Sequence, residues 1–148
     1  MNRRNFIKGA IVTTATLASK KAFADDYSQK AISDLNRLMS KDAPTGLEQS
    51  HVPGIKTPGS VKAGEWFDVK VKVGFMKDHP STPGHWITVI KLIVDGNEAA
   101  KSTFRTGGIA GSVAVFRIKL DRTATLEAKE NCNLHGTWIS EPLIVKVV

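Results

Sequence analysis

Residues 65–74 read EWFDVKVKVG and residues 111–121 read GSVAVFRIKLD. In both stretches apolar and charged side chains alternate. In the first, three valines are separated by lysines and follow an aspartate. A period of two places successive side chains on opposite faces of a β-strand. Each stretch therefore predicts a strand with one buried and one exposed face.

Further strands are predicted on either side of these two. Residues 86–94 form a largely apolar run interrupted by Lys91, and the Asp95-Gly96 pair that follows is typical of a hairpin turn. Weaker strands are predicted after this turn, over 123–129 and over 143–148. Six or seven short strands with Gly and Pro turns and no helices between them favour an antiparallel sandwich. We expect an all-β, immunoglobulin-like β-sandwich of about seven strands over residues 46–148.

The segment before this domain has a different period. Apolar side chains recur at helical spacing, which predicts a helix from Asp25 to Lys41 that Pro44 and Gly46 bring to an end. Residues 25–45 are thus expected to form a short N-terminal helix and a linker. The residues on its apolar face are Tyr27, Ala31, Leu35, Leu38 and Met39.

The positive charge of the chain is concentrated at its start. The 148 residues carry a formal charge of +7, but the first 24 contain five basic residues and no acid. Without those five charges the net charge is +2. A surface of this kind gives no reason to expect nucleic acid or a membrane as a partner of the mature protein.

Residues 1–24 have the pattern of an export signal. A basic start is followed by a weakly apolar stretch over 9–18 and by Ala22-Phe23-Ala24, a small-residue cleavage pattern. The apolar stretch is too short to span a bilayer. Arg3-Arg4 followed by NFIK resembles the twin-arginine signal. The resemblance implies recognition by the twin-arginine translocase and a bacterial periplasmic metalloprotein. The alternative is an amphipathic helix of the mature fold.

The chain has four histidines and a single cysteine, and each lies beside turn residues. Imidazole and thiolate together suit iron, copper or zinc. Structural zinc would favour two or more cysteines, and a blue-copper site would need an axial methionine, which does not follow Cys132. The candidate metal ligands are His51, His79, His85, Cys132 and His135.

Three segments containing these residues carry a family resemblance. They are EQSHVPGI at 48–55, HPSTPGHW at 79–86 and CNLHGTW at 132–138. Together, in this order and with this spacing, they resemble the superoxide reductases, the desulfoferrodoxin and neelaredoxin group. The resemblance extends from about Leu47 to the end of the sequence.

The resemblance implies a mononuclear iron centre that cycles between Fe²⁺ and Fe³⁺. The four histidines would form an equatorial square and Cys132 would be the axial thiolate. Superoxide would be reduced to hydrogen peroxide at the open face. Asn133, Leu134 and Gly136 would shape the turn between Cys132 and His135, and their amides would tune the sulfur.

The sequence departs from the family pattern just before His51. Many members have Glu-Lys-His-Val-Pro, in which the glutamate caps ferric iron and the lysine supplies positive charge. Here Glu48 is one residue farther from the histidine, and Ser50 stands where the lysine is expected. Glu48 is a candidate sixth ligand, with a solvated loop carboxylate as the alternative. Lys56 and Lys77 are candidates for replacing the missing charge.

The electron donor is expected to be a separate protein. Longer family members carry a four-cysteine rubredoxin-like domain, and no cysteine precedes His51 here. A rubredoxin-like protein or a cytochrome of the periplasm is the expected donor, and the family's dimers and tetramers allow a homo-oligomer. Two rival hypotheses are an iron-thiolate electron carrier or redox sensor of the same fold, and a sulfur carrier with Cys132 as nucleophile.

Overall fold

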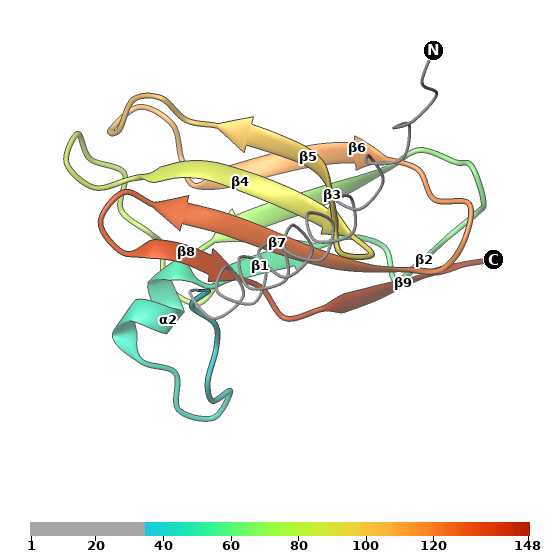
Figure 1. Ribbon diagram of the computed structural model, residues 1–148, viewed down its shortest axis with the longest axis horizontal. Coiled ribbons are helices and arrows are strands. Elements are labelled where there is room, and N and C mark those ends of the chain that lie inside the picture. Colours follow the sequence, from blue (N-terminus) through green and yellow to red (C-terminus); the bar gives the residue numbers. More distant parts are fainter. Residues whose placement is uncertain (1–34) are drawn as a thin grey trace, which may run out of the picture. The chain divides into compact units, whose positions relative to one another are not determined.

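A computed structural model describes residues 35–148, which contain one short helix and nine strands (Figure 1). The short helix precedes all the strands. The elements are α2 (Gly46–His51), β1 (Pro53–Lys56), β2 (Ser60–Val61), β3 (Phe67–Val73), β4 (Ile87–Val94), β5 (Asn97–Thr103), β6 (Val113–Ile118), β7 (Ala124–Cys132), β8 (Gly136–Ile139) and β9 (Leu143–Val147).

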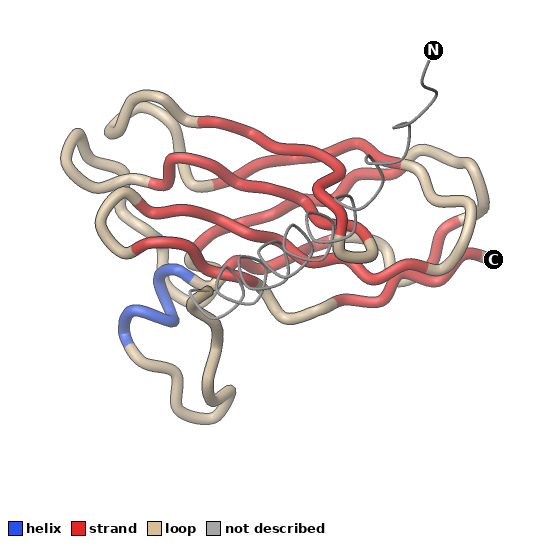
Figure 2. The backbone as a smooth tube through the Cα atoms, viewed as in Figure 1, coloured by secondary structure: helices blue, strands red, loops and turns tan. Residues whose placement is uncertain are grey.

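The strands form two sheets packed face to face (Figure 2). One sheet has the order β1-β3-β6, and the other has the order β2-β9-β7-β4-β5 with β8 paired to β7. All pairs are antiparallel except the short β2–β9 pair. The inward side chains of β3, β4, β6 and β7 form the core, with Val69, Ile90, Phe116 and Leu126 among them. The predicted β-sandwich is confirmed.

Strands with clear alternation lie where the sequence predicts them. The burial of β3 alternates along its seven residues, and the valines at its odd positions are almost inaccessible to water. Three strands, β1, β2 and β8, were not predicted, because two to four residues are too few to display a period. Strand β7 runs three residues past its predicted end and finishes at Cys132.

The segment before the sandwich differs from its prediction where it is described. Residues 35–41 are not helical, and Asn36 instead forms an isolated parallel bridge with Trp138. Backbone bonds to β8 favour an extended chain here. Gly46 begins a helix, α2, where the sequence predicted that one ends. Residues 25–34 of the predicted helix and the predicted signal at 1–24 lie outside the described residues.

No helix among residues 35–148 is long and apolar enough to cross a membrane.

Candidate metal centre

All five candidate ligands gather at one end of the sandwich. His51 is the last residue of α2, Cys132 is the last residue of β7, and His135 lies in the turn between β7 and β8. His79 and His85 both lie in the connection between β3 and β4. Register explains part of this arrangement. Ile87 pairs with Cys132, so the residues just before β4 lie beside the cysteine.

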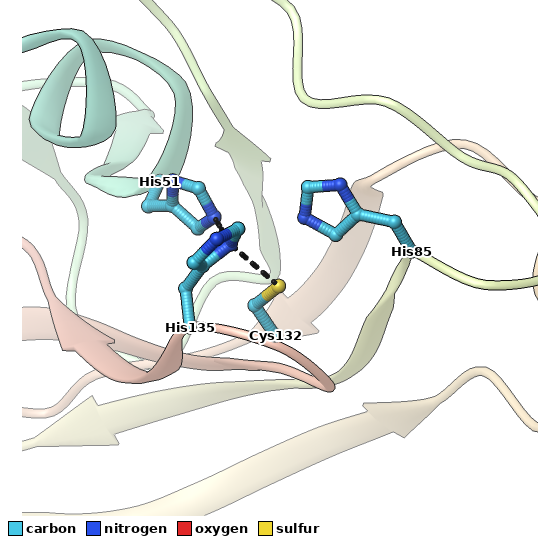
Figure 3. A group of neighbouring side chains, drawn as sticks. All are labelled: His51, His85, Cys132 and His135. Atoms are coloured by element: carbon cyan, nitrogen blue, oxygen red, sulfur yellow. Dashed lines mark hydrogen bonds between the residues drawn. The ribbon is translucent and has the colours of Figure 1, made fainter.

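The side chains of four of these residues point toward one another (Figure 3). The donor atoms of His51, His85, Cys132 and His135 all lie within 4.8 Å of one another. Cys132 Sγ is 3.6 Å from His135 Nδ1, which in turn is 2.9 Å from His51 Nε2. Segments that are far apart in the sequence thus supply a compact group of nitrogen and sulfur donors.

His79 lies outside that group of four but completes a ring of imidazoles. Its ring centroid is 4.7 Å from that of His51 and 4.6 Å from that of His85. The remaining sides, from His85 to His135 and from His135 to His51, measure 4.9 and 4.7 Å. Neighbouring rings are steeply inclined, by 70° to 86°, whereas the opposite rings of His51 and His85 are inclined by 27°. The four imidazoles therefore form a closed ring with sides of similar length and a distance of 6.0 Å between the opposite rings of His51 and His85.

Hydrogen bonds to backbone carbonyls determine which ring nitrogen of His51 and of His79 is free to bind a metal. His51 Nδ1 donates to the Leu47 carbonyl at 2.8 Å, and His79 Nδ1 donates to the Pro80 carbonyl at 2.6 Å. These bonds leave a lone pair on the Nε2 atom of each ring. The buried Nε2 atoms of His79 and His85 have no hydrogen-bond partner. For His135, Nδ1 is the nitrogen that faces the group.

Burial keeps the imidazoles of His51, His79 and His85 in the neutral form that binds metals. Burial, together with the nearby charge that His51 would carry, lowers the pKa of His79 to about 4. The pKa of His51 is also lowered, chiefly by burial, and burial followed by the charge of His135 lowers the pKa of His85. At neutral pH the rings therefore offer lone pairs without first losing a proton.

Cys132 is 1% exposed, and burial raises the pKa of its thiol. Backbone N–H groups of Leu134 and His135 donate to the sulfur and oppose that rise. The turn that brings them there needs Gly136, which has a φ of +74° in the left-handed region and pairs with Cys132. A buried thiol of this kind loses its proton when a cation binds it.

Asn133 fastens this turn to the segment around His85. Its side chain accepts from the Trp86 amide at 2.9 Å and donates to the Gly84 carbonyl at 2.8 Å. Its own amide donates to the Trp86 carbonyl at 3.2 Å. The two bonds of the side chain lie on either side of His85. Asn133 thus fixes the position of His85 relative to Cys132.

Gly74 lets the loop of His79 approach the helix of His51. Its φ is +69°, and a Cβ here would lie 2.7 Å from both His79 N and Ser50 O, and closer still to Lys77 O. Lys77 N also donates to Gln49 O at 3.1 Å. A side chain at position 74 would therefore force α2 and the His79 loop apart. Gly74 was not predicted as a site residue from the sequence, although a glycine at the end of an alternating strand can mark a close approach of another backbone segment.

Glu130 is a second residue that sequence reasoning missed. It lies on β7 two residues before Cys132, where alternate side chains point into the core, and it is 1% exposed. Neither carboxyl oxygen has a hydrogen-bond partner, and burial raises the pKa of Glu130 to about 9. The side chain is therefore a neutral acid at pH 7. Extending the alternation of 123–129 by one step would have placed it inward.

Glu48 is not brought into the group of ligands. Its Oε2 accepts from the Thr45 amide at 2.6 Å, and its Oε1 accepts from the Met39 amide at 2.8 Å. These bonds from Thr45 and Met39 lower the pKa of Glu48. Thr45 Oγ1 accepts in return from the Glu48 amide, which completes a capping box at the start of α2. The carboxylate is therefore engaged at the other end of the helix from His51.

Of the three residues considered in connection with the missing positive charge, Ser50 lies next to His51, and the Lys77 amide is bonded to the helix of His51. Ser50 Oγ donates to the Gly46 carbonyl at 3.0 Å and lies 3.0 Å from His51 Nδ1, behind the ring. Lys56 is exposed at the end of β1, and Lys77 is exposed in the loop that leads to His79. Ser50 thus supports the helix rather than the face where Nε2 of His51 points.

The donor set fits a transition metal that would be held by nitrogen and sulfur. The donor atoms of three histidines and Cys132 lie within 4.8 Å of one another, and the ring of His79 lies beside that of His51. The buried Nε2 atoms of His79 and His85 have no hydrogen-bond partner among the described residues. Buried polar atoms are normally paired, so unpaired imidazole nitrogens beside a group of other donor atoms favour a metal-binding site. Imidazole and thiolate suit iron, copper or zinc.

Comparisons with known proteins agree with this geometry. A profile of the desulfoferrodoxin family, described as Desulfoferrodoxin, matches residues 43–141. A desulfoferrodoxin from Nitratidesulfovibrio vulgaris is 36% identical over 105 residues, which cover 71% of this chain and 72% of that protein. The solved structure of a superoxide reductase (neelaredoxin) from Ignicoccus hospitalis superposes with a TM-score of 0.66 at 28% identity. It covers 77% of this chain and 95% of its own.

The matched region contains every candidate ligand, from His51 to His135. The match therefore includes the complete group of histidines together with the only cysteine. By its sequence and by its fold, this chain belongs to the desulfoferrodoxin family.

Proposed function

We propose that this protein is a periplasmic superoxide reductase with one mononuclear iron. The ligands would be Nε2 of His51, His79 and His85, Nδ1 of His135 and the thiolate of Cys132. The observation that carries the proposal is the ring of four imidazoles beside the only cysteine, with the centroids of neighbouring imidazoles 4.6 to 4.9 Å apart. A metal held by four imidazoles and one thiolate would keep one further coordination position for a substrate.

The enzyme class is that of the relatives. Among the similar solved structures, variants of the Ignicoccus hospitalis protein are also described as superoxide reductase (neelaredoxin), one with 31% identity and a TM-score of 0.62. The family, together with a His and Cys group suited to a single metal, supports a mononuclear iron site. Bound ferrous iron would supply the one electron that reduces superoxide to the level of hydrogen peroxide.

The residues of the chain contribute position, electron donation and access. Burial at 1% exposure keeps water from the Cys132 sulfur, and the N–H groups of Leu134 and His135 moderate how strongly that sulfur donates. The half-buried His85 and His135 form the more accessible side of the ring, whereas His51 and His79 are buried. A small anion would approach from that side, and the two protons of hydrogen peroxide would come from solvent there.

Electrons would come from a separate donor, a rubredoxin-like protein or a cytochrome of the periplasm. The competing proposal is an electron carrier or redox sensor with the same site. The specific observation in its favour is Ser50, which stands where many family members have a lysine. A carrier would exchange electrons with proteins and react slowly with superoxide.

Pulse radiolysis of the reduced protein separates these proposals. A reductase reacts with superoxide at a rate approaching the diffusion limit, about 10⁸–10⁹ M⁻¹s⁻¹. A rate lower by several orders of magnitude, with one iron per chain still present, would support the carrier. Absence of metal from protein purified from its native host would support a role for Cys132 as a bare nucleophile instead.

The periplasmic location is tested at the leader. Replacing Arg3 and Arg4 with lysines should leave unprocessed protein in the cytoplasm, because the translocase reads the planar guanidinium pair. Cell fractionation and the mass of the protein measure this outcome. Normal accumulation of the processed variant in the periplasm would rule out the twin-arginine route.

A further inference from the structure

Residues 36–39, called here the N-terminal strap, are bonded to the strand that follows His135. The Asn36 amide donates to the Thr137 carbonyl and the Ile139 amide donates to the Asn36 carbonyl, each at 2.9 Å. Asn36 Nδ2 donates to the Thr137 carbonyl at 3.1 Å and reaches the His135 carbonyl at 3.4 Å. The beginning of the strap therefore holds the turn that carries His135.

The other end of the strap is bonded to the helix that carries His51. The Met39 amide donates to Glu48 Oε1 at 2.8 Å, while Oε2 of the same carboxylate caps α2 through Thr45. Glu48 is 5% exposed, so these charge-assisted bonds are shielded from water. A single carboxylate thus joins the strap to the start of α2.

These two attachments lie three residues apart on the strap, and they connect elements that are far apart in sequence. His51 and His135 are 84 residues apart, yet their facing nitrogens are 2.9 Å apart. The helix and β8 otherwise meet through side chains, with the ring of His51 stacked on Trp138 at 5.2 Å. The strap adds hydrogen bonds to this contact and sets the distance between the two elements.

We propose that Glu48 is a positioning residue that locks the strap to α2 and thereby fixes His51 opposite His135. The proposal rests on the metal site proposed above, and it assigns Glu48 a role different from that of a sixth ligand. Both oxygens of Glu48 accept backbone N–H bonds. Within residues 35–148, the group of donor atoms formed by His51, His85, Cys132 and His135 includes no carboxylate. Because the bonds of Glu48 to Met39 and Thr45 involve no metal, Glu48 would position His51 in the apoprotein as well as in the metal-bound protein.

Metal affinity of the full chain tests the lock. Cobalt(II), added to apoprotein in competition with a chelator, is the probe. Glu48→Ala should weaken cobalt binding by about 10- to 100-fold, the usual effect of removing a group that orients a ligand. Glu48→Gln, which keeps one acceptor oxygen, should weaken it less. The matched control is Asp95→Asn, which removes a carboxylate that accepts the Thr125 amide at 2.9 Å away from the site, and it should leave affinity unchanged.

A second variant acts at the opposite end of the strap. Asn36→Ala removes the side-chain bonds to the His135 turn without touching the carboxylate, and it should also weaken cobalt binding. Because both changes release one strap, the double variant should bind cobalt about as weakly as the worse single variant. Should Glu48→Ala fail to fold, Asn36→Ala and Glu48→Gln still decide the question. Unchanged cobalt affinity in these variants would overturn the proposal.

Azide and the ferric protein distinguish a lock from a ligand. With Glu48 as a lock, azide shifts the visible absorption of the ferric wild-type protein and of ferric Glu48→Gln alike. A shift seen only in the variant would assign the carboxylate to the sixth position and overturn the proposal. If the wild-type protein fails to react with superoxide while the cobalt affinities of the variants fall as expected, the result contradicts the proposed function and supports the positioning role of Glu48.

Discussion

The turns at the two ends of the β4–β7 pair each contain a glycine with a positive φ, but they differ in whether the polar groups beside them are paired. The turn between β4 and β5 has Asp95 and Gly96 at φ values of +48° and +80°, and the turn between β7 and β8 has Gly136 at +74°. In the first, the Asp95 carboxylate accepts the Thr125 amide and lies 3.3 Å from Arg122. This end of the pair satisfies its own polar groups.

The ligand-bearing end leaves polar groups unsatisfied. Nε2 of His79 and of His85 are buried without partners beside the turn of Cys132. Each such atom costs about 1–3 kcal/mol relative to a paired one. The polar groups of the β4–β5 turn therefore stabilise the sandwich, whereas the unpaired nitrogens at the ligand end destabilise the apoprotein. A bound metal would stabilise the folded protein by supplying a partner for these nitrogens.

The largest effect is expected from removing the sulfur. Cys132→Ser should abolish the visible charge-transfer band of the ferric protein, because a serine hydroxyl is not a thiolate donor at neutral pH. The absorption spectrum of oxidised protein measures it. The Asp95→Asn protein, which is altered only at the β4–β5 turn, should keep the full intensity of this band. Persistence of the band in Cys132→Ser would mean that Cys132 is not the axial ligand.

Glycine replacements at the two ends should differ in size. Gly74→Ala places a Cβ 2.7 Å from His79 N and Ser50 O at a φ of +69°. Strain and overlap together should lower the free energy of unfolding by about 3 kcal/mol or more. Gly96→Ala, at a φ of +80° with nothing within 4 Å, should lower it by only about 1–2 kcal/mol. Denaturant titration of the two variant apoproteins measures both free energies of unfolding. If the two variants lose equal amounts, the loop of His79 can move away from α2.

Acid should destabilise the apoprotein through its ligand end. The pKa of His79 is about 4 in the folded protein, below the value of about 6.5 in an unfolded chain. The unfolded state therefore binds more protons between these values, and the stability that the neutral ring contributes is present above pH 6.5 and lost as pH falls toward 4. His79→Gln should flatten this dependence in denaturant titrations at several pH values. An equally steep dependence in the variant would assign the acid sensitivity elsewhere.

The smallest effect is expected from restoring a lysine. Ser50→Lys should raise the second-order rate with superoxide at low salt by about tenfold or more, because charge near a site steers an anion toward it. The gain should shrink as salt shortens the screening length to about 10 Å at 0.1 M. Asn97→Lys adds the same charge beside the distant β4–β5 turn and should change the rate little. Equal rates for the two variants at low salt would show that charge near α2 does not steer superoxide.

Sequence reasoning predicted the strands whose period was long enough to be seen. The alternation in 65–74 and 111–121 gave β3 and β6, and Asp95-Gly96 gave the β4–β5 turn. The helix α2 has six residues and begins at a glycine, so propensity could not indicate it. Its capping box was present in the sequence as Thr45 and Glu48, three residues apart.

The candidate ligands were predicted because motif and residue type identify them, whereas their orientation depends on contacts between distant segments. The choice of ring nitrogen in His51 depends on the Leu47 carbonyl, and the position of His85 depends on Asn133. The engagement of Glu48 by Met39 depends on a chain segment predicted to be helical. These contacts appear only when the fold is known.

The wide sequence separation of the ligands has a consequence for the time course of folding. His51 and His135 face each other across 84 residues, and His135 lies beyond the last residue of β7, a strand paired with β4. Contacts of such range form late, after the loops between them have closed. A chain with only part of the sandwich formed offers its imidazoles and thiol separately and holds a metal weakly. When apoprotein refolds with metal present, the thiolate-to-metal absorption band should therefore develop in the slowest kinetic phase. Its rate of appearance would then report when the sandwich is complete.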